Sequence, residues 1–129
     1  MDRRKLVLGL LMLVACGRSR AAPVFPPALG VWQLKSAQSF PASTAPELVR
    51  KTGTRGWWSA AYEGPGSATV ELYELTSTPG GLDLVQRWRS SADTVVWYTP
   101  RYFVVVRWRG ADRAAVGAFV RALEKQFAE

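Results

Sequence analysis

The sequence predicts an α+β fold in which a mainly antiparallel sheet of about five strands carries three helices, in the order β-α-β-β-α-β-β-α. Three observations predict it. Strand-like runs rich in valine and aromatic residues occur in two pairs, and glycine or proline lies between the members of each pair. Helix start and stop signals separate these pairs, and the last segment repeats apolar residues at helical spacing. With 129 residues, of which 48% are hydrophobic, the chain is long enough for one domain around a single core.

The first strand and the first helix follow from short local signals. Residues 31–39 come after a proline-rich turn and alternate in the manner of a strand. Thr44 lies three residues before Glu47, which is the spacing of a capping box, and Gly53 fits a C-terminal cap. We therefore expect a short helix over residues 46–51.

A hairpin and a second helix come next. Strand-like runs at residues 55–63 and 67–77 flank Gly64-Pro65-Gly66, which has the composition of a tight turn, so the two runs are expected to pair antiparallel. A helix is expected over residues 81–89, with its apolar face formed by Leu82, Val85 and either Trp88 or Arg89.

The second hairpin and the last helix complete the domain. Residues 93–110 contain two strands around Thr99-Pro100-Arg101, where proline suits the second position of a type I turn. Asp112 is placed to cap the helix that follows. The apolar residues of that helix recur at helical spacing at Val116, Phe119, Val120, Leu123 and Phe127.

Several strands are apolar on both faces. Adjacent residues of a strand point to opposite faces, so Trp57 and Trp58 do so as well. This indicates that helices cover both faces of the sheet or that one face is a binding surface. On the last strand, Tyr102, Val104, Val106 and Trp108 are expected to lie beneath the C-terminal helix. The other face, with an apolar base and a cationic edge, consists of Phe103, Val105, Arg107 and Arg109.

The N-terminus has the layout of an export signal. A basic head, residues 2–5, precedes the apolar residues 6–15, and an arginine-containing polar stretch follows. Ten residues rise only about 15 Å as a helix, roughly half of a bilayer core. A permanent transmembrane span is therefore not expected.

Leu13-Val14-Ala15-Cys16 resembles the bacterial lipobox. The resemblance implies a lipoprotein signal peptide over residues 1–15, cleavage before Cys16, a thioether-linked diacylglyceryl group on its thiol and further acylation of the new N-terminus. Residues 16–25 would then be the lipidated cysteine with a short tether, and residues 26–129 a single α+β domain. A soluble exported protein cut near residues 19–21 is the alternative.

The lipobox resemblance also implies a location. We expect a lipid-anchored protein of the bacterial cell envelope. Gly17 follows the cysteine, whereas aspartate at this position retains Gram-negative lipoproteins in the inner membrane. In a Gram-negative host the periplasmic face of the outer membrane is therefore favoured.

A second resemblance covers most of the mature chain. The phrases FPPALGVWQL, AAYEGPGSATVELYEL, LVQRWR and YFVVVRW resemble a family of uncharacterised small bacterial lipoproteins, a domain of unknown function frequent in acidobacteria. The resemblance implies no activity, cofactor or catalytic residue.

The residue types limit the chemistry. The chain has no histidine and one cysteine, which excludes Ser-His-Asp and Cys-His sites and a typical zinc site. We therefore expect no catalytic residue, metal or cofactor, and we favour a binding protein over an enzyme. A hydrolase with paired carboxylates, Glu63 with Glu71 or Glu74, is left open. Against it, solvated carboxylates of a strand or turn explain these residues equally well. Glu71 and Glu74 are three residues apart on one strand and face opposite ways, which argues against a metal site made of carboxylates.

Arginines lie beside aromatic residues near the second helix and the last hairpin. The candidate binding surface consists of Arg87, Trp88, Arg89, Arg101, Phe103, Arg107 and Arg109. It suits an anionic glycan, a lipid headgroup or an envelope protein. Nucleic acid is not expected in this compartment. The competing interpretation is that these are solvated arginines that discourage pairing at the sheet edge.

Together these features predict a membrane-tethered, non-enzymatic accessory or binding module of the cell envelope, held to the membrane through lipid on Cys16. The alternative is a carrier or enzyme that acts on an anionic envelope ligand through the surface of arginine and aromatic residues.

Overall fold

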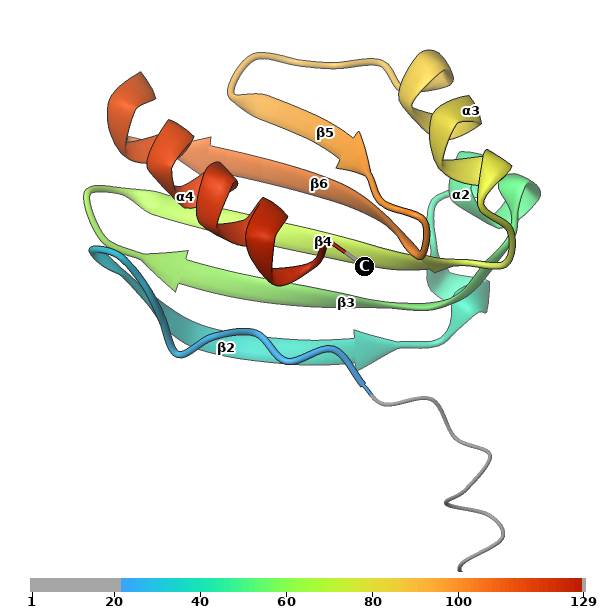
Figure 1. The fold of residues 1–129 in the computed structure, drawn as a ribbon, viewed down its shortest axis with the longest axis horizontal. Helices are drawn as coiled ribbons and strands as arrows, with labels where there is room; N and C mark the ends of the chain where they lie inside the picture. Colours follow the sequence, from blue (N-terminus) through green and yellow to red (C-terminus); the bar gives the residue numbers. More distant parts are fainter. Residues whose placement is uncertain (1–21, 129) are drawn as a thin grey trace, which may run out of the picture.

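The computed structural model describes residues 22–128 (Figure 1). The predicted signal segment and Cys16 lie outside these residues. The chain folds into one six-stranded sheet in which every neighbouring pair is antiparallel, in the order β1-β2-β3-β4-β6-β5. The strands are β1 (Ala28–Leu29), β2 (Trp32–Phe40), β3 (Thr54–Glu63), β4 (Ser67–Leu75), β5 (Thr94–Tyr98) and β6 (Tyr102–Arg109).

The predicted fold class and element order are confirmed, with one strand more than expected. The additional strand is β1, whose Leu29 pairs with Trp32 across a turn in which Gly30 has a φ of 61°. Two residues are too few to show an alternating pattern. Glycine is favoured in that turn because a side chain disfavours positive φ.

Within residues 22–128 three α-helices accompany the sheet: α2 (Glu47–Thr52), α3 (Pro79–Arg87) and α4 (Arg113–Gln126). Asp112 caps α4 as predicted, since its side chain accepts the Ala115 N–H at 2.8 Å. Gly53 ends α2 as predicted, with its N–H donated to the Val49 carbonyl at 2.9 Å.

The predicted capping box is wrong. Residues Ala42–Thr44 form a short 3-10 helix, and the Thr44 hydroxyl donates to the Pro41 carbonyl at 2.8 Å. The helix α2 instead starts after Pro46, which makes no side-chain cap. Pro41 and Pro46 flank this segment and restrict its backbone, so Thr44 does not take the N-cap position of α2.

The second predicted helix starts and ends two residues early, as α3. Pro79 is its first residue, where the missing N–H is no loss and the fixed φ suits a helix. Gly81 packs so closely on Tyr98 of β5 that an added Cβ would lie 2.6 Å from the tyrosine ring. Gly80 and Gly81 therefore belong to a packed first turn of α3.

Helices cover both faces of the sheet, and the two tryptophans diverge as predicted. Trp58 packs with the core beneath α4, whereas Trp57 packs with the core beneath α2 and α3. The α4 core is larger and includes the predicted set Tyr102, Val104, Val106 and partly buried Trp108. Within residues 22–128 no helix is long and apolar enough to cross a bilayer.

Candidate functional site

The apolar part of the expected binding surface is not exposed. Phe103 and Val105 each have 0% exposure and belong to the core that α2 and α3 cover. The Trp88 ring packs on Phe103, with centroids 5.2 Å apart. The expectation of an exposed apolar base at Phe103 and Val105 is therefore corrected. Strand alternation placed them on the right face, but it could not show that α3 lies over them.

Three of the five expected arginines are in ion pairs. Arg87 bonds to Asp83 at 3.0 Å within α3, and Arg101 bonds to Glu74 at 3.2 Å. Arg107 bonds to Glu71 at 2.6 Å. Among the described residues, no salt bridge involves the other two, Arg89 and Arg109.

These arginines also lie far apart along the sheet. Arg101 precedes β6 and Arg109 ends it, so the length of the strand separates them. Arg107 and Arg109 share a face, while Arg87 and Arg89 lie at the end of α3. The structure does not gather the predicted residues into one surface.

One polar cluster lies on the face of the sheet that α2 and α3 cover. Glu71 accepts a hydrogen bond from the Tyr73 hydroxyl at 2.9 Å and the ion pair from Arg107. Burial first, and then the neighbouring Glu71 carboxylate, raises the pKa of Tyr73. The hydrogen bond to Glu71 raises the pKa of Arg107. The cluster therefore links side chains of β4 and β6, and both raised pKa values keep the Tyr73 phenol and the Arg107 guanidinium protonated.

The carboxylates do not form a catalytic pair. Glu71 is held by Tyr73 and Arg107, and Glu74 lies on the opposite face beside Arg101. Glu63 pairs with Ser67, four residues along β4 from Glu71, which corresponds to about 13 Å. Between residues 22 and 128 no three acidic, histidine or cysteine side chains are grouped to hold a metal ion.

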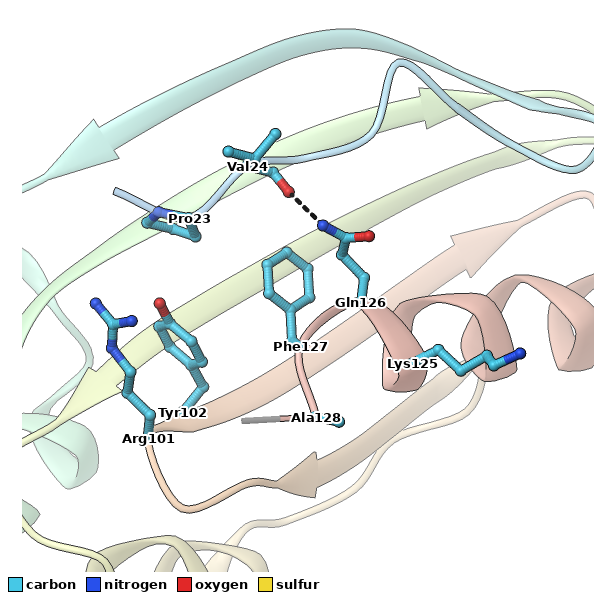
Figure 2. Close-up of a pocket in the computed structure, with 8 residues that line it drawn as sticks. All are labelled: Pro23, Val24, Arg101, Tyr102, Lys125, Gln126, Phe127 and Ala128. Atoms are coloured by element: carbon cyan, nitrogen blue, oxygen red, sulfur yellow. Dashed lines mark hydrogen bonds between the residues drawn. The ribbon is translucent and has the colours of Figure 1, made fainter. Parts of the chain in front are cut away.

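A pocket of about 380 Å³ lies where the chain enters the domain (Figure 2). The Gln126 side chain donates to the Val24 carbonyl at 3.3 Å across its rim. The lining includes two cations, Arg101 and Lys125, but Lys125 points away from Arg101 in Figure 2. Because the cations do not converge and Arg101 already pairs with Glu74, this pocket has poor geometry for an anion.

A larger opening, about 800 Å³, lies between α4 and the start of β5. We name it the α4–β5 groove. It is open along its length and differs in this from an enclosed cavity. Its floor and walls are formed by Ala92, Asp93, Thr94, Val95, Trp108, Ala111, Asp112, Arg113, Val116, Gly117, Val120 and Arg121. Its volume falls within the range of ligand sites, about 300–1,000 Å³.

Gly117 lies in the wall of this groove. Glycine in a helix interior costs about 1 kcal/mol relative to alanine, and helix glycines often serve close packing. Here a Cβ would meet only the guanidinium of Arg121, the nearest nitrogen at 3.3 Å. That group is the end of a flexible side chain, so packing does not require a glycine at this position.

Two arginines flank Gly117 on the wall of the groove. Arg113, Gly117 and Arg121 are four residues apart and therefore follow one stripe of α4. Both arginines are exposed, and neither is in a salt bridge within the part of the chain that the structure describes. This four-residue spacing is visible in the sequence and is the signal that could have identified the wall. The position of α4 beside β5 was not predictable from it.

Comparison with known proteins adds nothing to this geometry. No protein-family model, curated protein or solved structure matches the chain. The α4–β5 groove therefore stands on its shape and residues alone. Those residues suit binding, with an apolar floor and charges at the rim.

Proposed function

We propose that this protein is a membrane-tethered, non-enzymatic binding module of the cell envelope, and that the α4–β5 groove is its binding site. The observation that carries the proposal is the placement of this groove relative to the chain entry. Arg113 to Arg121 of α4 line the groove, whereas Gln126 at the other end of α4 contacts the entering chain. The fourteen residues of α4 correspond to a length of about 21 Å.

The entering chain is tied to the end of α4. Besides the bond between Gln126 and Val24, the Phe25 ring packs edge-on against Phe127 at 5.6 Å. From a lipidated Cys16 to Ala22 there are six residue steps, at most about 20 Å when extended. A tether this short holds the C-terminal end of α4 near the bilayer. The groove at the start of α4 then points toward partners away from that membrane.

The anchor is tested on the protein purified from its native membranes. Mass spectrometry should find an N-terminal Cys16 that carries a diacylglyceryl group and further acylation. The variant Cys16→Ser should move from the detergent phase to the aqueous phase. An intact or differently cut N-terminus, or unchanged partitioning of the variant, would contradict the anchor while leaving the groove untouched.

The binding site is tested by site-specific crosslinking in cell envelopes. A photoreactive amino acid at Val120, which is half-buried in the groove, should give a discrete product that Gly117→Leu abolishes by filling the space. The same amino acid at Gln38, an exposed position of the far strand β2, is the control and should give none. A product from Val120 that persists in Gly117→Leu would refute the groove as the binding site.

A further inference from the structure

The edge of β5 beside the α4–β5 groove has free backbone groups. The Trp108 N–H donates to the Asp93 carbonyl at 3.1 Å, and the Thr99 N–H donates to the Tyr102 carbonyl at 2.8 Å. Residues in an antiparallel ladder alternate between bonded and non-bonded positions. The two bonds therefore turn the N–H and C=O groups of Val95 and Trp97 toward β6. Those of Thr94, Val96 and Tyr98 point outward.

The outward groups have no backbone partner within residues 22–128. Gly81 of α3 packs on the Tyr98 ring. The outward groups away from that contact belong to Thr94, which lines the groove, and to Val96, which follows it along the edge. The opposite edge of the sheet differs. There β2 carries Lys35, has a bulge between Leu34 and Ser36, and is partly paired with β1. Lysine and bulges are features that protect an edge from pairing, and β5 has neither of them.

The wall of the groove fixes what side chains an added strand would need. Arg113 and Arg121 are eight residues apart, about 12 Å along α4. Residues i and i+4 of an extended strand are about 13 Å apart and point to the same face. The helix and β5 run in roughly the same direction (Figure 1), so the two spacings match. Two acidic residues of this chain, Asp93 and Asp112, also line the groove. Neither pairs with these arginines: Asp112 accepts a backbone N–H, and Asp93 lies on the strand side of the groove.

We infer that the partner binds as an extended peptide segment that adds a strand to the edge of β5, with acidic residues at i and i+4 on Arg113 and Arg121. The residue at i+2 is apolar and lies opposite Gly117, above Val116 and Val120. Main-chain hydrogen bonds to Thr94 and Val96 supply affinity, and the alternate side chains supply specificity. This inference rests on the proposed function of the groove and names the class of ligand.

The test uses the full chain carrying Cys16→Ser and an acetylated, amidated peptide Thr-Asp-Thr-Val-Thr-Asp-Thr. Titration followed by NMR should show binding with a Kd below about 1 mM, the weak end of peptide recognition. Amide exchange of Thr94 and Val96 should slow at least about tenfold at saturation, because hydrogen-bonded amides exchange only on opening. Exchange of Val95 and Trp97, already bonded to β6, should change little.

Three controls separate the parts of the inference. Replacing both aspartates of the peptide by lysine should weaken binding at least about tenfold, since like charges then meet at the wall. Arg113→Ala with Arg121→Ala should weaken it about as much, whereas Arg109→Ala, an exposed arginine on the other face, should not. Two further peptides carry N-methyl groups on one or the other alternating set of backbone amides. Only the peptide whose methylated amides face β5 should lose binding.

Several results would overturn the inference. They are no binding at 1 mM, equal binding of the lysine peptide, or protection elsewhere than Thr94 and Val96. Protection of these amides that grows with protein concentration without peptide would assign the edge to a second copy of the chain and also overturn it. If these tests fail while crosslinking from Val120 depends on Gly117, the proposed function stands and only the ligand class is wrong.

Discussion

The helices α3 and α4 pack differently against the two ends of β5. At its C-terminal end, Gly81 of α3 lies against the Tyr98 ring, and an added Cβ would lie 2.6 Å from the ring. At its N-terminal end, Gly117 of α4 faces an open groove, where an added Cβ would meet only the flexible end of Arg121. The same residue type thus serves close packing at one end and leaves space at the other. The difference teaches that a helix glycine indicates a binding site only when nothing packs on it.

The largest expected loss of stability tests which backbone groups of β5 point away from β6. Val95→Pro should destabilise the fold by at least about 2 kcal/mol, because it removes an N–H that the ladder turns toward the carbonyl of fully buried Val106. Val96→Pro removes an outward N–H and should cost about 1–3 kcal/mol less. Urea denaturation measures both free energies of unfolding. Equal losses would show that the outward groups of β5 were misassigned.

The stability of the core beneath α4, which contains Tyr62, should also fall at high pH. Burial raises the pKa of Tyr62 to about 12, from an ordinary value of 10.0. The folded state therefore keeps this phenol protonated while the unfolded chain loses the proton. The contribution is complete below pH 10 and is lost as the pH rises through 12, up to about 2–3 kcal/mol.

The variant Tyr62→Phe isolates this effect. It loses the hydrogen bond to the Pro26 carbonyl, 2.8 Å long, and should be less stable at pH 8. Its free energy of unfolding should then fall less than that of the wild-type protein between pH 10 and 12. Parallel pH dependences in the two proteins would show that Tyr62 does not keep its proton in the folded state.

A smaller loss of stability tests the packing of α3 against the end of β5. Gly81→Ala should cost about 1–3 kcal/mol, because the methyl group overlaps the Tyr98 ring and forces α3 away from β5. Thermal unfolding of this variant measures the loss. A neutral substitution would mean that α3 is not held against the end of β5, and the accessible edge would then extend to Tyr98.

Local patterns in the sequence predict most of the fold. The alternating strands, the Asp112 cap and the Gly53 cap lie where the residues indicated, because each depends on neighbours within a few residues. The strand β1 was missed since two residues carry no pattern. Thr44 and Glu47 had the spacing of a capping box, but flanking prolines gave the segment another conformation.

The candidate site depends on contacts that no local pattern contains. Alternation along β6 separated Phe103 from Val104 correctly, yet only the position of α3 buries Phe103. Arg107 of β6 is paired with Glu71 of β4, a contact between strands that no local pattern predicts. The groove lies between α4 and the start of β5, and its one sequence signal is the spacing of Arg113, Gly117 and Arg121.

Gly117 leaves space beside the α4–β5 groove, and the fold does not need a glycine at this position. The free energy of unfolding of Gly117→Ala tests this most directly. Alanine should stabilise the protein by about 0.5–1 kcal/mol, because helix propensity rises and only the Arg121 side chain has to move. A loss of stability, comparable to that of Gly81→Ala, would show that Gly117 is packed and that the α4–β5 groove is not open.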